Sequence, residues 1–267
     1  MDWYFLGWLA VLLYVGAEAV SIASLVRPRG LGLAPALLAV GLVLQFIDLQ
    51  MRARALGSVP YRTLAGSMVL FGWMLGVAYL ALLFRHRERA VGPFLIPFVI
   101  VFSAIGLLIP FRPTPPRPET QGVAFALHVT LAILGYAAFT LSFVLSLLYL
   151  IQSRQIRRAR TGVLFARLPA LEVIGRMNRT AVSIGLGSLL VSVALGAAWA
   201  RRVWTGMGDA KLPWALFTLL VYGFLLWMDR RGWNGQRVAL LSIAGFALVI
   251  FSYTVVNLYF SQAHAFR

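Results

Sequence analysis

The sequence predicts an all-α polytopic membrane protein with about eight transmembrane helices and both termini outside the cytoplasm. Apolar residues make up 61% of the 267 residues, charged residues only 12%, and the mean hydropathy is +0.84. Soluble globular domains contain about 25% charged residues, so this composition is typical of a chain that lies in a bilayer. The apolar runs lack the alternation of a membrane β-barrel, and open strands would leave backbone groups unsatisfied in lipid.

Eight apolar runs follow one another along the chain, each near the roughly 20 residues that span a hydrocarbon core. The seventh run is short and begins at Pro213, which the first turn of a helix tolerates because its missing N–H would have no partner there. No internal repeat or low-complexity tract is present, so we expect a single integral membrane domain over residues 1–267. The predicted spans are Trp3 to Val26, Leu31 to Leu49, Leu64 to Phe84, Val91 to Phe111, Val123 to Ile151, Thr180 to Ala200, Pro213 to Met228 and Val238 to Phe260.

Two connections between these runs have their own character. The segment from Arg112 to Gln121 is rich in proline, which predicts a stiff, non-helical connector. The segment from Arg154 to Asn178 mixes apolar residues with arginines, a pattern typical of a helix that lies on the membrane surface. We expect that helix to be an interfacial anchor without a catalytic role.

The distribution of lysine and arginine predicts the orientation. Fifteen of the 24 cations fall in the loops after the first, third, fifth and seventh spans, and nine fall on the opposite side. Positive loops face the cytoplasm, so both termini should lie outside. This topology places His128, the loop from Arg201 to Leu212, and His264 on the outer side, and it places His86 among cytoplasmic arginines.

Several classes of protein are excluded by the residue types. The chain has no cysteine, so it contains no disulfide, thiolate metal site or thioether to a cofactor. Its net charge of +16 comes from arginines in short loops, which membrane orientation explains better than nucleic acid. A hydrolase is not indicated, because the eight carboxylates are scattered. Glu18 and Asp48 lie inside predicted spans, where they either serve a proton-linked transport function or form hydrogen bonds between helices.

Histidine is the candidate ligand. Two neutral imidazoles can occupy the axial positions of haem iron, and His128 and His264 lie at span ends that should share one side of the membrane. The alternative interpretation of each is an interfacial residue with a satisfied hydrogen bond. His86 is interpreted as a solvated loop residue.

The loop between the sixth and seventh spans adds aromatic and basic groups on the same side. Trp199, Trp204 and Trp214 flank a short polar turn, and tryptophan faces suit a flat macrocycle. The turn contains the cations that would pair with propionate groups and one acid: Arg201, Arg202, Lys211 and Asp209. An aromatic belt at the membrane interface is the alternative explanation.

These segments together resemble the cytochrome c assembly family, the CcsA and CcmC type of haem-handling membrane protein. Trp199-Ala200 and Trp204 resemble the front of the family's outward tryptophan-rich loop, and its end is matched with Asp209, Lys211 and Trp214 retained. Leu127-His128-Val129 resembles the helix of the first outward histidine. The segment leading from Tyr253 to His264 resembles the closing helix and second histidine. The resemblance covers approximately residues 41–267.

The resemblance implies a cytochrome c biogenesis protein that binds haem non-covalently and transiently at its outer face and presents it to apocytochrome c. It implies His128 and His264 as haem ligands, and haem contacts for Trp199, Trp204, Trp214, Arg201, Arg202, Asp209 and Lys211. Expected partners are haem, apocytochrome c, other assembly subunits and the lipid bilayer, without nucleic acid. We expect a multi-pass protein of a bacterial-type inner (plasma) membrane. It would not be an independent enzyme, but it could be a subunit of a haem-attachment complex.

The chain also departs from the family pattern. The tryptophan-rich loop is two residues shorter and lacks its middle tryptophans, and Gln45 and Trp227 stand where the eight-span type has two histidines inside the membrane. A second, inner haem site is therefore not expected. The shortened loop favours an alternative function: a non-enzymatic accessory or regulatory subunit of tetrapyrrole or cytochrome assembly that keeps the scaffold without haem transfer.

Overall fold

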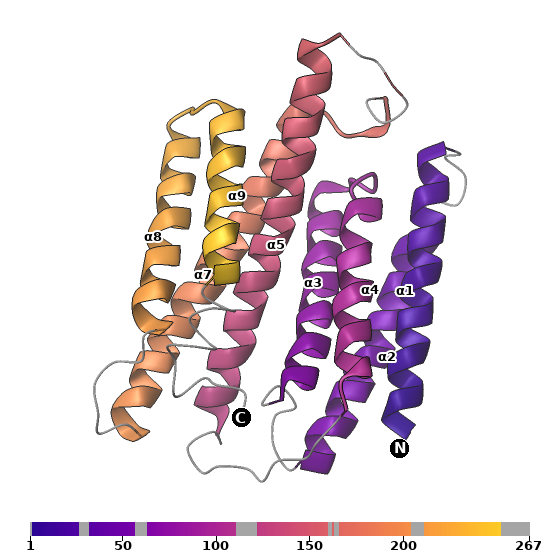
Figure 1. Cartoon of the computed structure of the whole chain (residues 1–267), viewed down its shortest axis with the longest axis vertical. Helices are drawn as coiled ribbons and strands as arrows, with labels where there is room; N and C mark the ends of the chain where they lie inside the picture. Colours follow the sequence, from indigo (N-terminus) through magenta and orange to yellow (C-terminus); the bar gives the residue numbers. More distant parts are fainter. Residues whose placement is uncertain are drawn as a thin grey trace. The chain divides into compact units, whose positions relative to one another are not determined.

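Eight long helices make up most of the chain that the structure describes (Figure 1). The computed structural model describes residues 2–26, 32–56, 63–110, 122–159, 162, 166–203 and 211–251, with only the backbone for 2–3, 200–203 and 211. The helices are α1 (Asp2–Val26), α2 (Leu33–Leu56), α3 (Leu64–His86), α4 (Gly92–Leu108), α5 (Val123–Arg157), α7 (Leu171–Val203), α8 (Lys211–Arg230) and α9 (Gly235–Phe251). The prediction of eight helices is confirmed. The side on which the termini lie stays a prediction.

The lengths of several helices differ from those of the predicted spans. Six helices are long and apolar enough to cross a membrane, while α4 and α9 have 17 described residues each. The seventh run, which is short in the sequence, lies within α8, and that helix has 20 residues. Helix α4 is short because Ile109 adopts an extended backbone at φ −72° and ψ 124°. A residue before a proline disfavours the helical conformation, and Pro110 follows.

The prediction of one surface helix from Arg154 to Asn178 is wrong at both ends of that segment. Helix α5 continues to Arg157, and α7 already begins at Leu171. Ile174, Met177 and Ala181 are fully buried, and their spacing of three and four residues marks one face of a helix. That apolar face simply continues into the membrane-spanning part of α7. Residues 163–165 of the predicted anchor lie outside the described residues.

The chain divides into two compact units. Unit 1 contains residues 1–116 and 154–173, and unit 2 contains residues 117–153 and 174–267. The prediction of one integral membrane domain concerns how the two units combine and stays a prediction.

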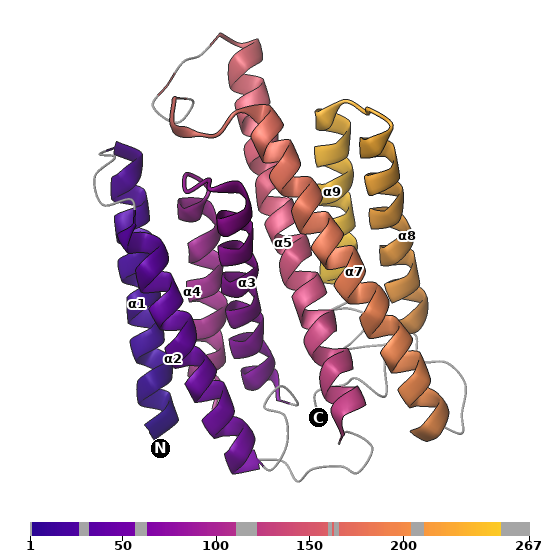
Figure 2. The same cartoon turned by 180° about the vertical axis from the view of Figure 1, so that it is seen from behind.

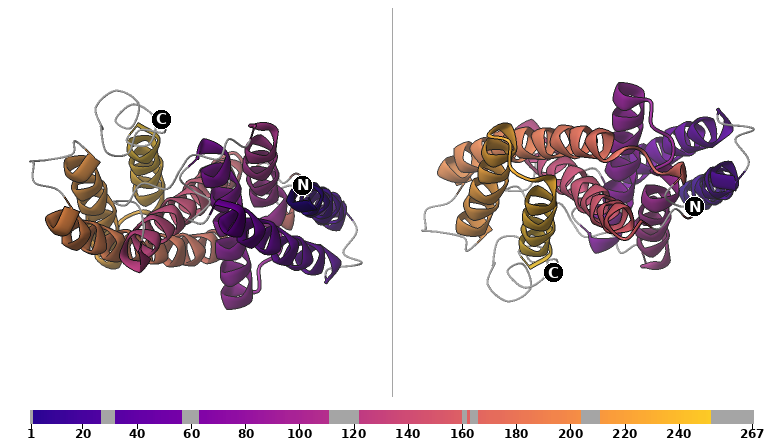
Figure 3. Two further views of the ribbon diagram at one scale, coloured as in Figure 1. Left: turned by 90° about the horizontal axis from the view of Figure 1, so that it is seen from below. Right: turned by 90° about the horizontal axis from the view of Figure 1, so that it is seen from above.

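Unit 1 is a ring of four helices. Helix α1 packs against α2 and α4, and α3 packs against the same two helices, so the ring α1–α2–α3–α4 closes on itself (Figure 3). Small residues allow this closeness: a Cβ on Gly106 of α4 would lie 2.7 Å from the carbonyl oxygen of Ala65 in α3. Arg167 extends to the end of α1, where its Nη2 donates to the carbonyl of Val26 at 3.3 Å.

Unit 2 also contains four helices, with α5 in contact with the other three. Phe139 of α5 stacks on Tyr222 of α8 with ring centroids 3.7 Å apart, and both side chains are fully buried. Phe143 stacks on Phe246 of α9 at 4.6 Å. Helix α7 runs beside α5 in the opposite direction (Figure 2). The core of unit 2 is therefore aromatic at its centre and is organised around α5.

Candidate functional site

The imidazole of His128, in the second turn of α5, is held by α7. Its Nδ1 lies 2.7 Å from the carbonyl oxygen of Ser192, and the Ser192 hydroxyl donates in return to the carbonyl of His128 at 2.7 Å. A carbonyl oxygen can only accept, so Nδ1 carries the proton. In the neutral ring this tautomer places the lone pair on Nε2, the atom that would bind a metal.

Close packing of α5 on α7 brings these residues together. A Cβ on Gly135 of α5 would lie 3.2 Å from the carbonyl oxygen of Gly185 in α7. His128 precedes Gly135 by seven residues, and Ser192 follows Gly185 by seven. Helices α5 and α7 are antiparallel, so two turns back along α5 from Gly135 and two turns forward along α7 from Gly185 reach the same height. His128 therefore contacts Ser192.

Aromatic rings surround this end of unit 2. Phe125, one turn before His128, contacts the half-buried Trp199 of α7 with centroids 5.5 Å apart. Trp214 of α8 contacts Phe251 of α9 at 4.9 Å. The start of α5, the end of α7, the start of α8 and the described end of α9 lie at the same end of unit 2 in Figures 1 and 2. The described helices therefore bring three of the predicted site residues to one end: His128, Trp199 and Trp214.

The other predicted site residues are described in part or not at all. Arg201 and Arg202 lie in the last turn of α7, and Lys211 is the first residue of α8, each with its backbone only. His264, Trp204 and Asp209 lie outside the described residues. The haem-ligand pair His128 and His264 thus stays a prediction.

Ser192 and Gly196 were missed by the sequence reasoning. A Cβ on Gly196 would lie 2.6 Å from both Cε1 and Nδ1 of His128, so the ring rests directly on the backbone of α7. The equal spacing of seven residues from Gly135 to His128 and from Gly185 to Ser192 becomes a signal only once the contact between the two glycines is known.

Gln45 occupies the centre of unit 1 and joins all four of its helices. Its Oε1 accepts from the hydroxyl of Tyr14 in α1 at 2.5 Å, and its Nε2 donates to Ser103 Oγ in α4 at 2.9 Å and to the Val69 carbonyl in α3 at 3.1 Å. Gln45 is only 2% exposed. Both amide protons and the amide oxygen are used, so this position stabilises the bundle and does not fit a haem ligand.

The second departure from the family pattern, Trp227, is a surface residue. Its ring is 52% exposed, it contacts Phe224, and Arg231 lies over it at 5.2 Å. An exposed tryptophan with a cation on its face is typical of the membrane interface. The absence of an inner haem site stays a prediction.

The two acids inside predicted spans have different surroundings. Asp48 accepts from Nε of Arg52, one turn later in α2, at 2.9 and 3.0 Å from its two oxygens, and both side chains are fully buried. Arg52 also lies 5.1 Å from the ring of Tyr4. Glu18 of α1 is half-buried, and its Oε2 has no hydrogen-bond partner among the described residues. Outside the spans, burial raises the pKa of Glu88, in the turn between α3 and α4.

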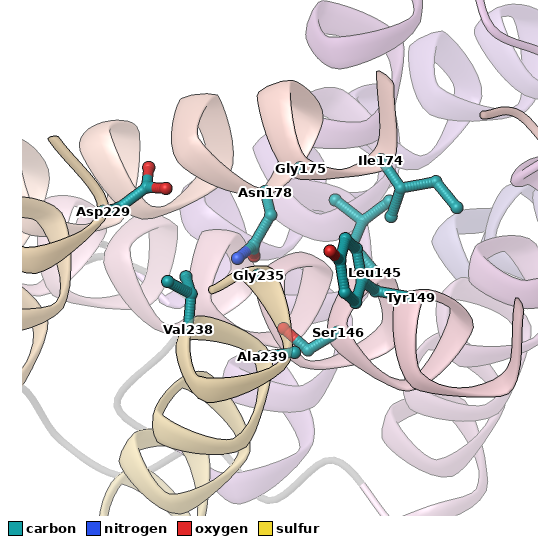
Figure 4. Close-up of a pocket in the computed structure, with 10 residues that line it drawn as sticks. All are labelled: Leu145, Ser146, Tyr149, Ile174, Gly175, Asn178, Asp229, Gly235, Val238 and Ala239. Atoms are coloured by element: carbon teal, nitrogen blue, oxygen red, sulfur yellow. The ribbon is translucent and has the colours of Figure 1, made fainter. Parts of the chain in front are cut away.

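A polar seam runs along α5 in unit 2, away from His128. Ser142 donates to Asn178 Oδ1 of α7 at 2.7 Å and contacts the hydroxyl of Ser242 in α9, so one hydroxyl joins three helices. One turn later a cavity of about 30 Å³ is bordered by Ser146 and Tyr149 of α5 together with residues of α7, α8 and α9 (Figure 4). The buried Oγ of Ser146 has no partner among the described residues. This volume suits a water molecule and is far too small for a macrocycle.

The residues at the His128 end fit haem in chemical type. Nε2 of a neutral imidazole binds iron, aromatic rings suit a flat apolar macrocycle, and the helix ends carry cations for carboxylates. Within the described residues no group of three or more His, Cys, Asp or Glu side chains could hold a metal ion. The arrangement is that of a helical membrane protein in which the imidazole of His128 lies near one end of a four-helix unit.

Comparison with known proteins places this chain among relatives of the same class. The family model described as cytochrome C assembly protein matches residues 61–264. The cytochrome c biogenesis protein CcsA of Chlamydomonas reinhardtii is 25% identical over 265 residues, which cover 96% of this chain and 72% of that protein. CcsA of Porphyra purpurea is 25% identical, with coverage of 94% and 92%. Protein HemX of Bacillus subtilis (strain 168) is 30% identical over 247 residues, with coverage of 86% and 85%.

The chain is thus a polytopic helical membrane protein, and it belongs to the cytochrome c assembly protein family. The family match begins later than the resemblance over residues 41–267 that the sequence analysis identified, and it ends at His264.

Proposed function

We propose that this protein acts in cytochrome c biogenesis by binding haem at its outer face and presenting it to apocytochrome c. The observation that carries the proposal is the imidazole of His128, which has Nδ1 bonded to the Ser192 carbonyl and Nε2 left with the lone pair. The family match and the CcsA relatives support the same role.

Each predicted site residue has a proposed part. His128 and His264 hold the iron of the cargo haem from its two faces. Trp199, Trp204 and Trp214 border the ring, and Arg201, Arg202 and Lys211 pair with its propionates, with Asp209 in the same loop. The chain has no cysteine, so the thiols for covalent attachment belong to the acceptor. The contribution of this protein is to hold and orient its cargo.

The location follows from the charge pattern. With most arginines on the cytoplasmic side of an inner (plasma) membrane, the His128 end faces outward, where other subunits of the assembly machinery and apocytochrome c would meet it. We propose a single haem station, because the Gln45 amide is fully bonded within its own bundle.

The test is haem binding by the purified protein in detergent. We expect an absorption band of bound haem that is lost in His128→Ala and in His264→Ala and kept in His86→Ala, the matched control at the end of α3. Haem binding that persists undiminished in both outward variants would overturn the assignment of the ligands. Pull-down of apocytochrome c by the haem-loaded protein, and not by the His128→Ala variant, then tests presentation.

A second candidate function is an accessory or regulatory membrane subunit that keeps the scaffold without haem transfer. One observation favours it: the tryptophan-rich loop is two residues shorter than the family pattern and lacks its middle tryptophans. A folded protein that stays colourless with haem, and in which His128→Ala has no effect on cytochrome c maturation in cells, would support this function over haem presentation.

A further inference from the structure

Ser192 contacts both the ring and the backbone of His128. The carbonyl oxygen of Ser192 accepts from Nδ1, and its hydroxyl donates to the His128 carbonyl, each at 2.7 Å. The Ser192 side chain is fully buried. Two bonds in opposite directions between residues 64 positions apart in the chain fix the distance and the rotation of the ring relative to α7.

Gly196 provides the surface on which the ring rests. In an α-helix the carbonyl of residue i points toward residue i+4, so the Ser192 carbonyl opens toward Gly196. A side chain at Gly196 would stand beside that carbonyl, since its Cβ would lie 2.6 Å from Nδ1 and Cε1 and 3.3 Å from Nε2 of His128. The distances to Nδ1 and Cε1 are far below van der Waals contact, so a side chain at this position would displace the imidazole from the Ser192 carbonyl.

We propose that Ser192 and Gly196 are positioning residues that hold His128 against α7 as the Nδ1–H tautomer, the form in which Nε2 carries the lone pair that a ligand would use. The identity of that ligand as haem iron rests on the function proposed above. The tautomer and the position of the ring against α7 do not depend on that function. Ligating histidines commonly donate their second nitrogen to a carbonyl, and loss of such a partner costs about 10- to 100-fold in metal affinity.

The first test needs no haem. Protein labelled with ¹⁵N-histidine in a His86→Gln, His264→Gln background contains His128 alone, and its ring nitrogens are read by NMR near pH 8, where imidazole is neutral. We expect a protonated Nδ1 and an unprotonated Nε2. The opposite tautomer, or an equal mixture as in free histidine, would overturn the proposal whether or not the protein binds haem.

The second test moves the ring. Gly196→Ala should displace it, convert the NMR signals to a tautomer mixture, and weaken haem binding by about tenfold or more. Gly187→Ala is the matched control, because Gly187 is on the same helix and a Cβ there would meet nothing within 4 Å. Ser192→Ala keeps the carbonyl and loses the hydroxyl bond, so it should retain the tautomer and have a smaller effect on haem.

A double-variant cycle separates positioning from a general effect on packing. In a His128→Ala background the ring is absent, so Gly196→Ala should no longer lower the midpoint of thermal unfolding, although it does so in the wild-type background. An equal effect in both backgrounds would show that Gly196 acts through helix packing and would sink the proposal. If the wild-type protein binds no haem but shows the Nδ1–H tautomer, the proposed function fails while the positioning roles stand.

Discussion

The two helical units differ in the polar groups that they bury. In the described part of the chain the fully buried charged side chains, Asp48 and Arg52, both belong to unit 1, and they lie on the same helix as the central amide of Gln45. Unit 2 keeps hydroxyls and amides inside, and its ion pair between Arg179 and Asp229 is partly exposed, at 48% and 16% of the two side chains. His128 lies near the end of α5 and is half-buried.

This difference separates structural polar groups from groups available to a ligand. A buried group whose donors and acceptors are all hydrogen-bonded lowers the free energy of the folded bundle. It has no donor or acceptor left to bind a ligand. The His128 imidazole, near a helix end, is oriented by the bond between its Nδ1 and the Ser192 carbonyl. Polarity inside a membrane helix therefore indicates function only when the partners of each atom are known.

The largest effect is expected from breaking the buried ion pair. Asp48→Asn should lower the free energy of unfolding by about 3 kcal/mol or more, because Arg52 would remain buried without its counter-charge. Denaturant unfolding in detergent micelles measures it. Asp229→Asn is the control, with an expected cost of about 1 kcal/mol or less because solvent reaches Arg179 and screens that pair. Equal costs for the two variants would contradict the contrast between the units.

The Gln45 network should come next. Gln45→Leu removes three hydrogen bonds and leaves the hydroxyls of Tyr14 and Ser103 buried without this partner, at an expected cost of about 2 kcal/mol in unfolding. Gln50→Leu, an exposed position on the same helix, should change stability little. Haem binding per folded molecule should be unaffected. A loss of the haem band in Gln45→Leu protein at temperatures where it is folded would show that unit 1 takes part in haem binding.

A smaller effect, on haem affinity instead of stability, is expected at the end of unit 2 that contains His128. Trp199→Ala should weaken haem binding about three- to tenfold, which is the order of one aromatic contact, with little change in the unfolding midpoint. Trp227→Ala, at the opposite end of α8 from Trp214, is the control and should leave haem affinity unchanged. Titration of haem by absorbance compares the variants. An unchanged affinity in Trp199→Ala would remove this ring from the proposed site.

The smallest effect should be a pH dependence in the turn between α3 and α4. Burial raises the pKa of Glu88, so the folded state favours the protonated acid. The resulting stabilisation is present below the ordinary pKa of 4.5 and is lost as pH rises through the higher folded value. Relative to Glu88→Gln, the wild-type protein should therefore lose thermal stability as the pH rises above 4.5. A difference that stays constant, or grows with pH, would contradict this environment for Glu88.

Local sequence patterns predicted much of the fold and only part of the site. Apolar runs of membrane-spanning length identified all eight helices, but the mixed pattern around Ile174 was assigned to the membrane surface because arginines interrupt it. Its buried residues recur at helical spacing, and the arginines project from the other face. His128, Trp199 and Trp214 were identified by residue type and position. Their neighbours Ser192 and Gly196 were not, since nothing in the local sequence marks a serine or a glycine as the partner of a histidine 64 residues away.

What the sequence by itself determined is the helical membrane class, the candidate histidine and the absence of imidazole at residues 45 and 227, because these depend on hydropathy and residue identity alone. Only the tertiary structure decided that Nδ1 of His128 is bonded to α7 and that every hydrogen-bonding group of the Gln45 amide is already used. Both depend on the register of packed helices, and a hydrogen bond or a van der Waals contact is made or lost within a fraction of an ångström. Hydropathy along a chain carries no information at that scale.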